Sequence, residues 1–329
     1  MMPAAQQTAL HPKAHVLGIE IDAVDMEAAL AEAATALHDS RKGYVCLVGV
    51  HGIMEARRSP RFAEVYAGAK MNLPDGMPLV WVGNLQGRAS MKRVFGPDLM
   101  LEIFRRKEFA GFTHFLYGGQ DGVAEQLRDK LTWQFPWARI VGTYTPGFHD
   151  LTHAEEEQFL SEIDAVRPDI VWVGIGCPKQ ELFMSRYLPL LHTTLMFGVG
   201  AAFDYHTGRI RDCAGWIKRC GLQWLHRLLQ DPRRLWRRYL RNNPAFVWHI
   251  ALQFAGLRRS PGTPRATART PAEHIGKPLP FRLRRIAEML KGRLRIFQGR
   301  YEEVEVGWVD VADRKDTQVL RGRRMDRES

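Results

Sequence analysis

The chain has 329 residues, of which 45% are hydrophobic and 25% charged, so it can form one large or two modest globular domains with a buried core. Its net charge of +11 is concentrated between residues 209 and 259, where Asp212 and Asp231 are the only acidic residues. This excess predicts an anionic partner, namely nucleic acid, an acidic membrane or a diphosphate. The four cysteines form no CxxC pair or His/Cys cluster, which argues against a zinc site and fits a reducing compartment.

Apolar runs of strand length alternate with stretches of helical periodicity from residue 15 onward. Strands are predicted at 15–21 (HVLGIEI), 43–50 (GYVCLVGV), 114–119 (HFLYGG), 139–145 (RIVGTYT), 169–176 (DIVWVGIG) and 194–203 (TLMFGVGAAF). Helices are predicted after the cap residue Asp25, from about 53 to 69, at 121–131, after a capping box formed by Thr152 and Glu155, and at 178–188. Near-continuous Val, Ile and Leu strands separated by helices predict an α/β fold with a mostly parallel, Rossmann-like sheet covered by helices on both faces. Ligands should bind at the carboxyl ends of its strands.

Composition divides the chain into segments: a flexible N-terminus (1–13), an α/β core (14–205), a basic helical appendage (206–259), a linker (260–280) and an extension without an assigned role (281–329). We expect Pro232 and Pro244 to divide the appendage into separate helices. The N-terminal segment lacks the apolar centre of a signal peptide. No run of about 20 apolar residues occurs either, so no ordinary transmembrane helix is expected. These features predict a cytoplasmic protein that can attach to a surface.

The appendage interleaves arginines with tryptophans, at Trp216, Trp224, Trp236 and Trp248. Such a region is a nucleic-acid surface, a membrane-interface helix or a helical cap with solvated arginines. Amphipathic aromatic rings and cationic side chains are both stabilised in the lipid headgroup layer. No helix-turn-helix, zinc-finger or RNP signature supports nucleic-acid binding. Membrane attachment is therefore favoured.

Glycine turns follow predicted strands at 117–122 (YGGQDG), 174–181 (GIGCPKQE) and 198–204 (GVGAAFD). Glycine lets a backbone approach a phosphate, and the following helix N-terminus offers N–H donors to an anion. The candidate nucleotide-binding residues are Gly118, Gly119, Gly176, Lys179, Gln180 and Glu181. Alternatively, the fold needs these glycines for its turns, Pro178 occupies the first helical turn and Glu181 compensates the helix dipole. Neither GxGxxG nor GxxxxGK(S/T) is present.

The segment MNLPDGMPLVW (71–81) places one acid, Asp75, between an apolar strand-like run and an apolar helix-like run. Asp75 is either the N-cap of the following helix or a general base that accepts a proton from a hydroxyl in a cleft. The flanking Pro74 and Gly76 fix an unusual local backbone, which a cap does not require. On these residues alone, both interpretations stay open.

Two further candidates lie near predicted strand ends and glycine turns. Arg93 begins RVFGPDL (93–99) and either clamps a phosphate or is solvated. His51 follows the strand at 43–50, and it is either structural or part of the site.

The motifs LPDGMPLVW, RVFGPDL, YGG, GIGCPKQE and the long segment from GVGAAFDYHTGRIRDC to LLQDPRRLWRRYL occur in the order found in the WecG/TagA/CpsF glycosyltransferases (glycosyltransferase family 26). The chain resembles this family over roughly residues 14 to 242. The resemblance implies inverting, metal- and cofactor-independent transfer of a sugar from a UDP-sugar to an undecaprenyl-diphosphate-linked saccharide. It also implies an enzyme of bacterial surface or exopolysaccharide synthesis that is peripheral on the inner face of the cell membrane.

The resemblance assigns the general base to Asp75 and places Arg93 and Gln180 in the active-site or nucleotide region. It makes the appendage arginines candidates for contact with a diphosphate or the membrane: Arg211, Arg219, Arg227, Arg234 and Arg237. The resemblance implies no nucleic-acid partner, and it leaves open whether the protein forms a homo-oligomer.

One departure concerns the strand CLVGVHG (46–52), where the family usually carries a polar T-x-N that aligns with Leu47 and Gly49. This departure predicts either a changed sugar specificity or a weakened enzyme, although His51 is retained. Two other functions remain as alternatives. One is a nucleotide-binding oxidoreductase, which the missing GxGxxG opposes, and the other is a non-enzymatic protein that binds membranes or nucleic acid through its basic region.

Overall fold

The computed structural model describes residues 11–147 and 151–257. The first ten residues of the predicted N-terminal segment, the last two of the appendage, the predicted linker (260–280) and the extension (281–329) lie outside the described residues.

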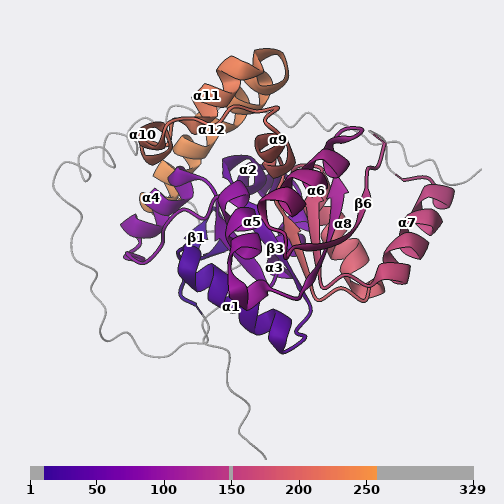
Figure 1. Cartoon of the computed structure of the whole chain (residues 1–329). Coiled ribbons are helices and arrows are strands. Elements are labelled where there is room, and N and C mark those ends of the chain that lie inside the picture. The colour runs from indigo at the N-terminus through magenta and orange to yellow at the C-terminus, as the bar shows by residue number, and fades with distance from the viewer. Residues whose placement is uncertain (1–10, 148–150, 258–329) are drawn as a thin grey trace, which may run out of the picture. The chain divides into compact units, whose positions relative to one another are not determined.

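A six-stranded sheet in the order β4-β3-β8-β7-β5-β6 forms the centre of the described region (Figure 1). Its strands are β3 (Gly43–Val48), β4 (Met71–Pro74), β5 (Thr113–Gly118), β6 (Arg139–Tyr144), β7 (Ile170–Gly174) and β8 (Leu195–Gly198). Every neighbouring pair is parallel. The predicted α/β class with a parallel sheet is therefore confirmed.

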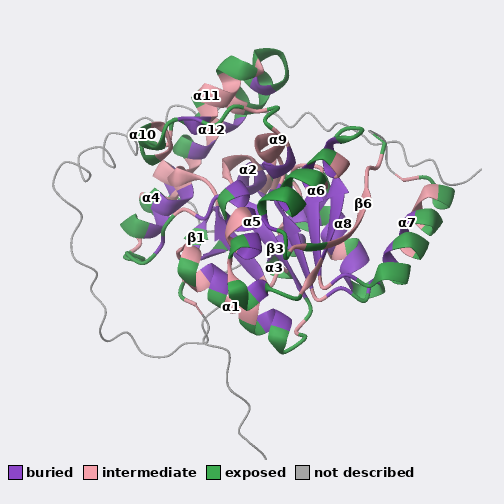
Figure 2. Cartoon of the chain, viewed as in Figure 1, coloured by how far each residue is buried: buried purple, intermediate pink, exposed green. Residues whose placement is uncertain are grey.

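Helices cover both faces of this sheet. Alternate residues of each strand point to opposite faces and pack into two separate hydrophobic cores. One face carries α1 (Met26–His38), α5 (Gly96–Arg105), α6 (Val123–Gln134) and α9 (Ala202–Thr207). The other carries α2 (Val50–Arg58), α3 (Pro60–Ala67), α4 (Met77–Leu85), α7 (His153–Val166) and α8 (Lys179–Tyr187). Short 3-10 helices lie at Lys107–Phe109 and Leu188–Leu190. Figure 2 shows the buried residues concentrated in the strands and on the inward sides of the helices.

Local sequence signals fix several helix starts. The Asp25 side chain accepts a hydrogen bond from the backbone N–H of Ala28 at 3.1 Å, as predicted for the cap of α1. Thr152 and Glu155 form the predicted reciprocal capping box at the start of α7.

Three predicted elements of the α/β core differ from the structure. The run 15–21 is a hairpin of β1 (Lys13–Val16) and β2 (Ile19–Asp22), because Leu17 and Gly18 adopt positive φ values of 51° and 94°. The predicted helix at 53–69 is two helices, since Ser59 caps α3 and Pro60 starts it. The run 194–203 is a strand only to Gly198, and its last residues begin α9.

The hairpin covers the outer edge of β4. The backbone N–H of Asn72 donates to Asp22 Oδ2 at 2.7 Å, and its side-chain amide donates to the Glu20 carbonyl at 3.1 Å. The hairpin therefore supplies polar partners to a strand that would otherwise present a free edge.

The appendage consists of α10 (Gly215–Arg219), α11 (Gln223–Gln230) and α12 (Pro232–Phe254). Pro232 occupies the first turn of α12, but the break predicted at Pro244 is wrong, because α12 continues through this residue. Leu240 and Pro244 are both exposed, so water can replace the backbone hydrogen bond that proline removes. Within the described residues, none of the helices combines the length and apolar character needed to cross a bilayer.

Candidate active site

The loops that follow neighbouring strands bring most of the predicted site residues to one edge of the sheet. Asp75 follows β4, Gly49 and His51 follow β3, and the turn containing Gly176 follows β7. The backbone N–H of Asp75 donates to the carbonyl of Val48 at 3.0 Å, so the loop after β4 lies against the end of β3. This edge is the place where parallel α/β sheets bind ligands.

Asp75 does not cap α4. The N-cap residue is Gly76, with no side-chain cap hydrogen bond among the described residues, so the capping interpretation is wrong. The Asp75 side chain is 32% exposed, yet its Oδ1 is buried and has no hydrogen-bond partner within the described part of the chain. Burial raises the pKa of Asp75, while the charges of Arg93 and Arg227 oppose this rise. The carboxylate is thus held at the site with an oxygen available to accept a proton.

Arg93 is fixed beside Asp75. Its Nε donates to the backbone carbonyl of Asp75, and its Nη2 lies 3.6 Å from Asp75 Oδ1. The guanidinium also lies over the Phe95 ring, with Cζ 4.3 Å from the ring centroid. These contacts contradict the solvated alternative and place a permanent positive charge next to the candidate base.

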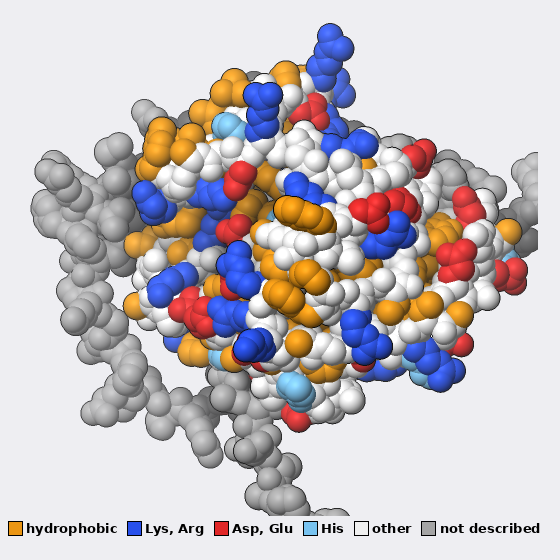
Figure 3. All heavy atoms as spheres, viewed as in Figure 1, with side chains coloured by type: hydrophobic (Ala, Val, Ile, Leu, Met, Phe, Trp, Pro, Cys, Tyr) orange, Lys and Arg blue, Asp and Glu red, His pale blue; other side chains and the backbone are white. Residues whose placement is uncertain are grey.

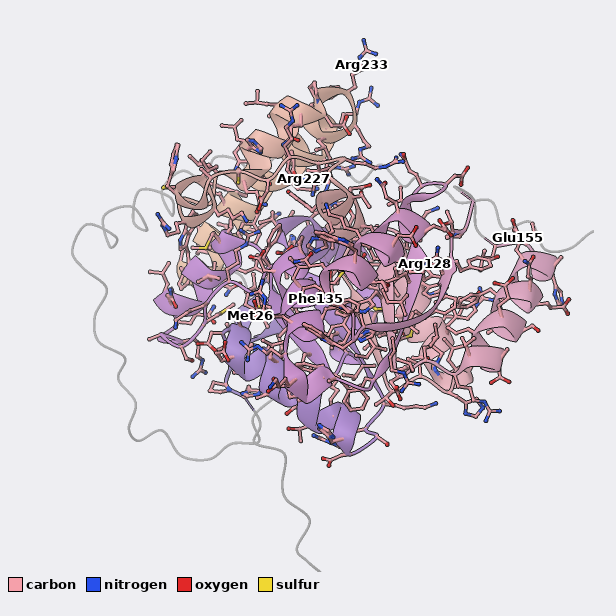
Figure 4. All side chains as sticks on the ribbon, viewed as in Figure 1. Met26, Arg128, Phe135, Glu155, Arg227 and Arg233 are labelled. Carbon is pink, nitrogen blue, oxygen red and sulfur yellow. The ribbon has the colours of Figure 1, made fainter. Side chains whose placement is uncertain are left out.

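Residues of the appendage complete the environment of Asp75 and Arg93. Gln223, at the start of α11, accepts a hydrogen bond from Arg93 Nη2 and donates to the Tyr205 hydroxyl at 3.2 Å. Arg227 lies over the Tyr205 ring, with Cζ 5.6 Å from its centroid. Figure 4 shows Arg227 at the base of the appendage, next to the core, whereas Arg233 points away from the core at its far end. Gln223 and Tyr205 were not predicted as site residues, because neither of these neutral side chains lies in a recognisable sequence motif.

Gln180 connects two of the glycine turns. Its Oε1 accepts from the backbone N–H groups of Gly176 at 3.2 Å and Gly200 at 2.9 Å. Its Nε2 donates to the Gly198 carbonyl at 3.1 Å and to Glu181 Oε1 at 3.0 Å. The amide therefore uses its full hydrogen-bonding capacity to hold the loops after β7 and β8 together.

Glu181 is fully buried in the first turn of α8. Its Oε2 is a buried oxygen without a hydrogen-bond partner in the described residues. Burial raises the pKa of Glu181 to about 7, and hydrogen bonding to Gln180 opposes this rise. Cys46, Tyr66 and Cys177 surround it, and burial raises the pKa of all three of these groups. The cysteines are free.

Packing explains the glycines at the end of β5, namely Gly118, its last residue, and Gly119, which follows it. A Cβ at Gly118 would lie 2.7 Å from the Gly174 carbonyl carbon, and one at Gly119 would lie 3.0 Å from Val123. Their φ values of 121° and 83° are also in the region that favours glycine. Gly176 differs, since its φ is 82° but no described atom lies within 4 Å of a Cβ built there. Gly176 therefore borders open space, whereas Gly118 and Gly119 permit close packing.

His51 belongs to a network between α2 and α12. Arg58 Nη2 donates to Asn242 Oδ1 at 2.6 Å, which orients the Asn242 amide so that its Nδ2 donates to His51 Nδ1 at 3.0 Å. Burial, together with Arg238 and Arg58, lowers the pKa of His51 to about 4. His51 is therefore a neutral side chain that joins the end of β3 to the appendage.

The remaining predicted residues lie near the surface. Lys179 is exposed at the first position of α8. Among the appendage candidates, the exposed ones are Arg211, Arg219, Arg234 and Arg237. Arg234 Nε pairs with Asp231 Oδ2 at 2.6 Å, and Arg237 lies over the Trp236 ring. The structure thus brings Arg227 to Asp75 and leaves the other four arginines facing solvent.

Leu47 and Gly49 occupy the two positions where the sequence departs from the family's T-x-N pattern, and Gly49 leaves space at the site. Leu47 is buried against Gly96 of α5, with 3.6 Å between its Cγ and a Cβ built at Gly96. No described atom lies within 4 Å of a Cβ built at Gly49, and its φ of −113° suits any residue. A side chain at position 49 would therefore fit without strain beside the loop that carries Asp75. The described residues contain no group of three or more His, Cys, Asp or Glu side chains that could hold a metal ion.

A carboxylate and two arginines lie together at the carboxyl edge of a parallel sheet, next to the basic helical appendage, and this edge is where α/β enzymes bind their ligands. The chain matches the glycosyl transferase WecG/TagA/CpsF family over residues 14–260 and belongs to it. It is therefore a glycosyltransferase.

Two curated relatives carry the same name, N-acetylglucosaminyldiphosphoundecaprenol N-acetyl-beta-D-mannosaminyltransferase. The protein of Bacillus spizizenii strain W23 is 30% identical over 224 residues, which cover 67% of this chain and 85% of the relative. The protein of Bacillus subtilis strain 168 is 28% identical over 179 residues, which cover 54% of this chain and 68% of the relative.

Proposed function

We propose that this glycosyltransferase moves a sugar from a UDP-sugar to an undecaprenyl-diphosphate-linked saccharide, with inversion at the anomeric carbon, in the synthesis of a bacterial surface polysaccharide or exopolysaccharide. The names of both relatives support the acceptor class, since they specify a diphosphoundecaprenol-linked N-acetylglucosamine. The observation that carries the chemistry is the buried Asp75 Oδ1, which lies 3.6 Å from Arg93 and is not engaged in a cap.

Asp75 acts as the general base in this proposal. The acceptor hydroxyl oxygen attacks the anomeric carbon on the face opposite UDP, and its proton passes to the Asp75 carboxylate. A new carbon–oxygen bond forms while the bond between the anomeric carbon and the phosphate oxygen breaks. UDP leaves with the bonding electrons, so negative charge develops on its diphosphate.

Fixed positive charges stabilise that leaving group. The charges of Arg93 and Arg227 both act on Asp75, which supports a role for these two arginines in binding the donor diphosphate. Such preorganised cations need no reorganisation as charge develops, and they keep the base ionised before transfer. Gln180 ties the start of α8 to the turn after β8, which fixes the loop after β7 beside the site.

The appendage would hold the enzyme at the inner face of the cell membrane, where a polyprenyl-linked acceptor is found. Exposed apolar residues on α10, α11 and α12 include Trp216, Leu229, Trp236 and Leu240. Exposed arginines such as Arg219 and Arg237 lie on the same helices. Figure 3 shows blue and orange side chains together on this part of the surface. The combination suits a headgroup layer that contains anionic lipid.

The test measures transfer from a panel of UDP-sugars to a polyprenyl-diphosphate saccharide by purified full-length protein, with and without EDTA. We expect product with one donor, product of inverted configuration, and activity that persists in EDTA. Asp75→Asn should abolish transfer while UDP binding and melting temperature remain at the wild-type level. Asp25→Asn is the matched control, because Asp25 is a true helix cap and asparagine caps equally well. Full activity of folded Asp75→Asn would refute the assignment of the base.

A further inference from the structure

The exposed residues of α4 are Trp81, Asn84 and Leu85, so this side is largely apolar and uncharged, although the helix belongs to the α/β core. Residues Met77–Leu85 contain no charged side chain. Leu79 and Val82 pack into the core, while Trp81 is 45% exposed and Leu85 is 68% exposed. Positions 81 and 85 are one helical turn apart and share a face. A surface helix of a globular protein normally presents polar or charged residues on that face.

This surface continues onto the appendage. Gly221, between α10 and α11, has a φ of 69°, and a Cβ built there would lie 2.6 Å from the Trp81 ring. The turn between α10 and α11 therefore rests directly on Trp81. Exposed apolar residues of the appendage follow on either side of this turn, at Trp216, Leu222 and Leu225. We call Trp81, Leu85, Trp216, Leu222 and Leu225 the apolar face; Figure 3 shows hydrophobic side chains over α4 and α10 at its upper left.

The surroundings of the apolar face are basic. Arg88 and Lys92 are exposed in the segment that follows α4, and Lys218 and Arg219 end α10. Asp25 and Asp212 pair with Lys92 and Lys218, respectively. The remaining positive charges, on Arg88 and Arg219, oppose contact with a second copy of the chain, which would bring the same charges to the interface. An anionic lipid surface offers the opposite charge together with an apolar interior.

We propose that α4 is a membrane-contact helix, which inserts Trp81 and Leu85 into the headgroup–acyl boundary of an anionic bilayer beside α10 and α11. This contact is additional to the appendage and does not depend on catalysis. Its consequence for transfer rests on the proposed function. Asp75 immediately precedes the Gly76 cap of α4, so a bilayer that binds α4 sets the depth of the candidate base relative to the lipid-linked diphosphate.

The experiment is co-sedimentation of the full chain with vesicles of phosphatidylglycerol and phosphatidylethanolamine. The double variant Trp81→Ser/Leu85→Ser should bind roughly tenfold more weakly than wild type, because two partly exposed apolar side chains no longer enter the boundary. Trp133→Ser is the matched control, since Trp133 is 84% exposed on α6, far from α4 in Figure 1. Leu85→Ser alone serves if the double variant is unstable, because Leu85 is the more exposed of the two.

Unchanged vesicle binding by a folded double variant would overturn the proposal, and so would an equal loss in Trp133→Ser. If sedimentation velocity shows a wild-type dimer that the double variant disrupts, with vesicle binding unchanged, the face is instead an interface between copies. Transfer to a short-chain, water-soluble diphosphate acceptor should be equal in wild type and double variant. If wild type transfers nothing but its vesicle binding still depends on α4, the proposed function fails while the contact helix stands.

Discussion

The buried carboxyl of Glu181 should make the stability of this protein depend on pH. Its folded-state pKa is about 7 and its ordinary value is 4.5, because burial disfavours the charged form. Between these two values the folded protein binds the proton more strongly than the unfolded chain does. The stabilisation is thus complete below pH 4.5, falls as pH rises toward 7 and is lost above 7. The difference corresponds to about 3 kcal/mol of folding free energy.

Glu181→Gln removes this dependence without removing the hydrogen bond. The glutamine side-chain carbonyl can still accept from Gln180 Nε2, and it cannot ionise. The stability of the variant relative to wild type should therefore be about 2.5 kcal/mol greater at pH 8 than at pH 5, because part of the stabilisation is already lost at pH 5. Other titrating groups cancel in this comparison, since they are the same in both proteins.

Urea denaturation followed by circular dichroism at pH 5 and pH 8 measures the effect. Glu157→Gln, at an exposed position of α7, controls for the loss of one negative charge. Equal pH dependence in wild type and Glu181→Gln would refute the burial argument. A variant that loses stability equally at both pH values would show that glutamine disturbs the packing around Gln180.

Other predictions concern the site and the appendage. Because burial raises the pKa of Asp75, kcat/KM should rise with pH through a value above the ordinary 3.8, and a limb at or below 3.8 would contradict this. Arg227→Ala should lower kcat/KM roughly 10²-fold, whereas Arg233→Ala, at the outer end of the appendage, should leave it near wild type. Gln223→Ala releases one side of Arg93 and should lower kcat roughly tenfold with little change in UDP binding; a change in binding alone would assign Gln223 to the nucleotide. Deletion of residues 206–329 should release the protein from membranes and reduce transfer to lipid acceptors, as fractionation and the transfer assay would show.

The order of strands and helices was predictable because each central strand is buried on both faces and so appears as a continuous apolar run. β3 is the clearest case, since all six of its residues are buried. The hairpin at the N-terminus was missed because Leu17 adopts a positive φ inside an apolar run, where only Gly18 suggested a turn. The continuity of α12 through Pro244 was also missed, because solvent access compensates for a broken hydrogen bond that the sequence alone makes costly.

The candidate site was predictable where a residue lies in a motif and not where tertiary contacts define its role. Asp75 lies between strand-like and helix-like runs, and the structure removes the capping alternative that its neighbours left open. The prediction that Gln180 contacts a ligand stays a prediction, whereas the hydrogen bonds by which it holds two turns together had no signal in the sequence. Gln223 contacts Arg93, which lies far away in the sequence, and Tyr205 contacts Gln223; no local sequence pattern indicates these tertiary contacts.

The hydrogen bonds between α12 and the N-terminal hairpin have a consequence for chain connectivity. Gln253 accepts from the backbone N–H of Leu17 and donates to the His15 carbonyl, each at 2.8 Å. The first and last elements of the described region are therefore side by side, with their backbones bridged by one side chain. Such neighbouring ends are the geometry that tolerates circular permutation. A short loop could join the end of α12 to β1, and a new start could be opened at the exposed Gly111 without separating any strand of the sheet from its neighbours.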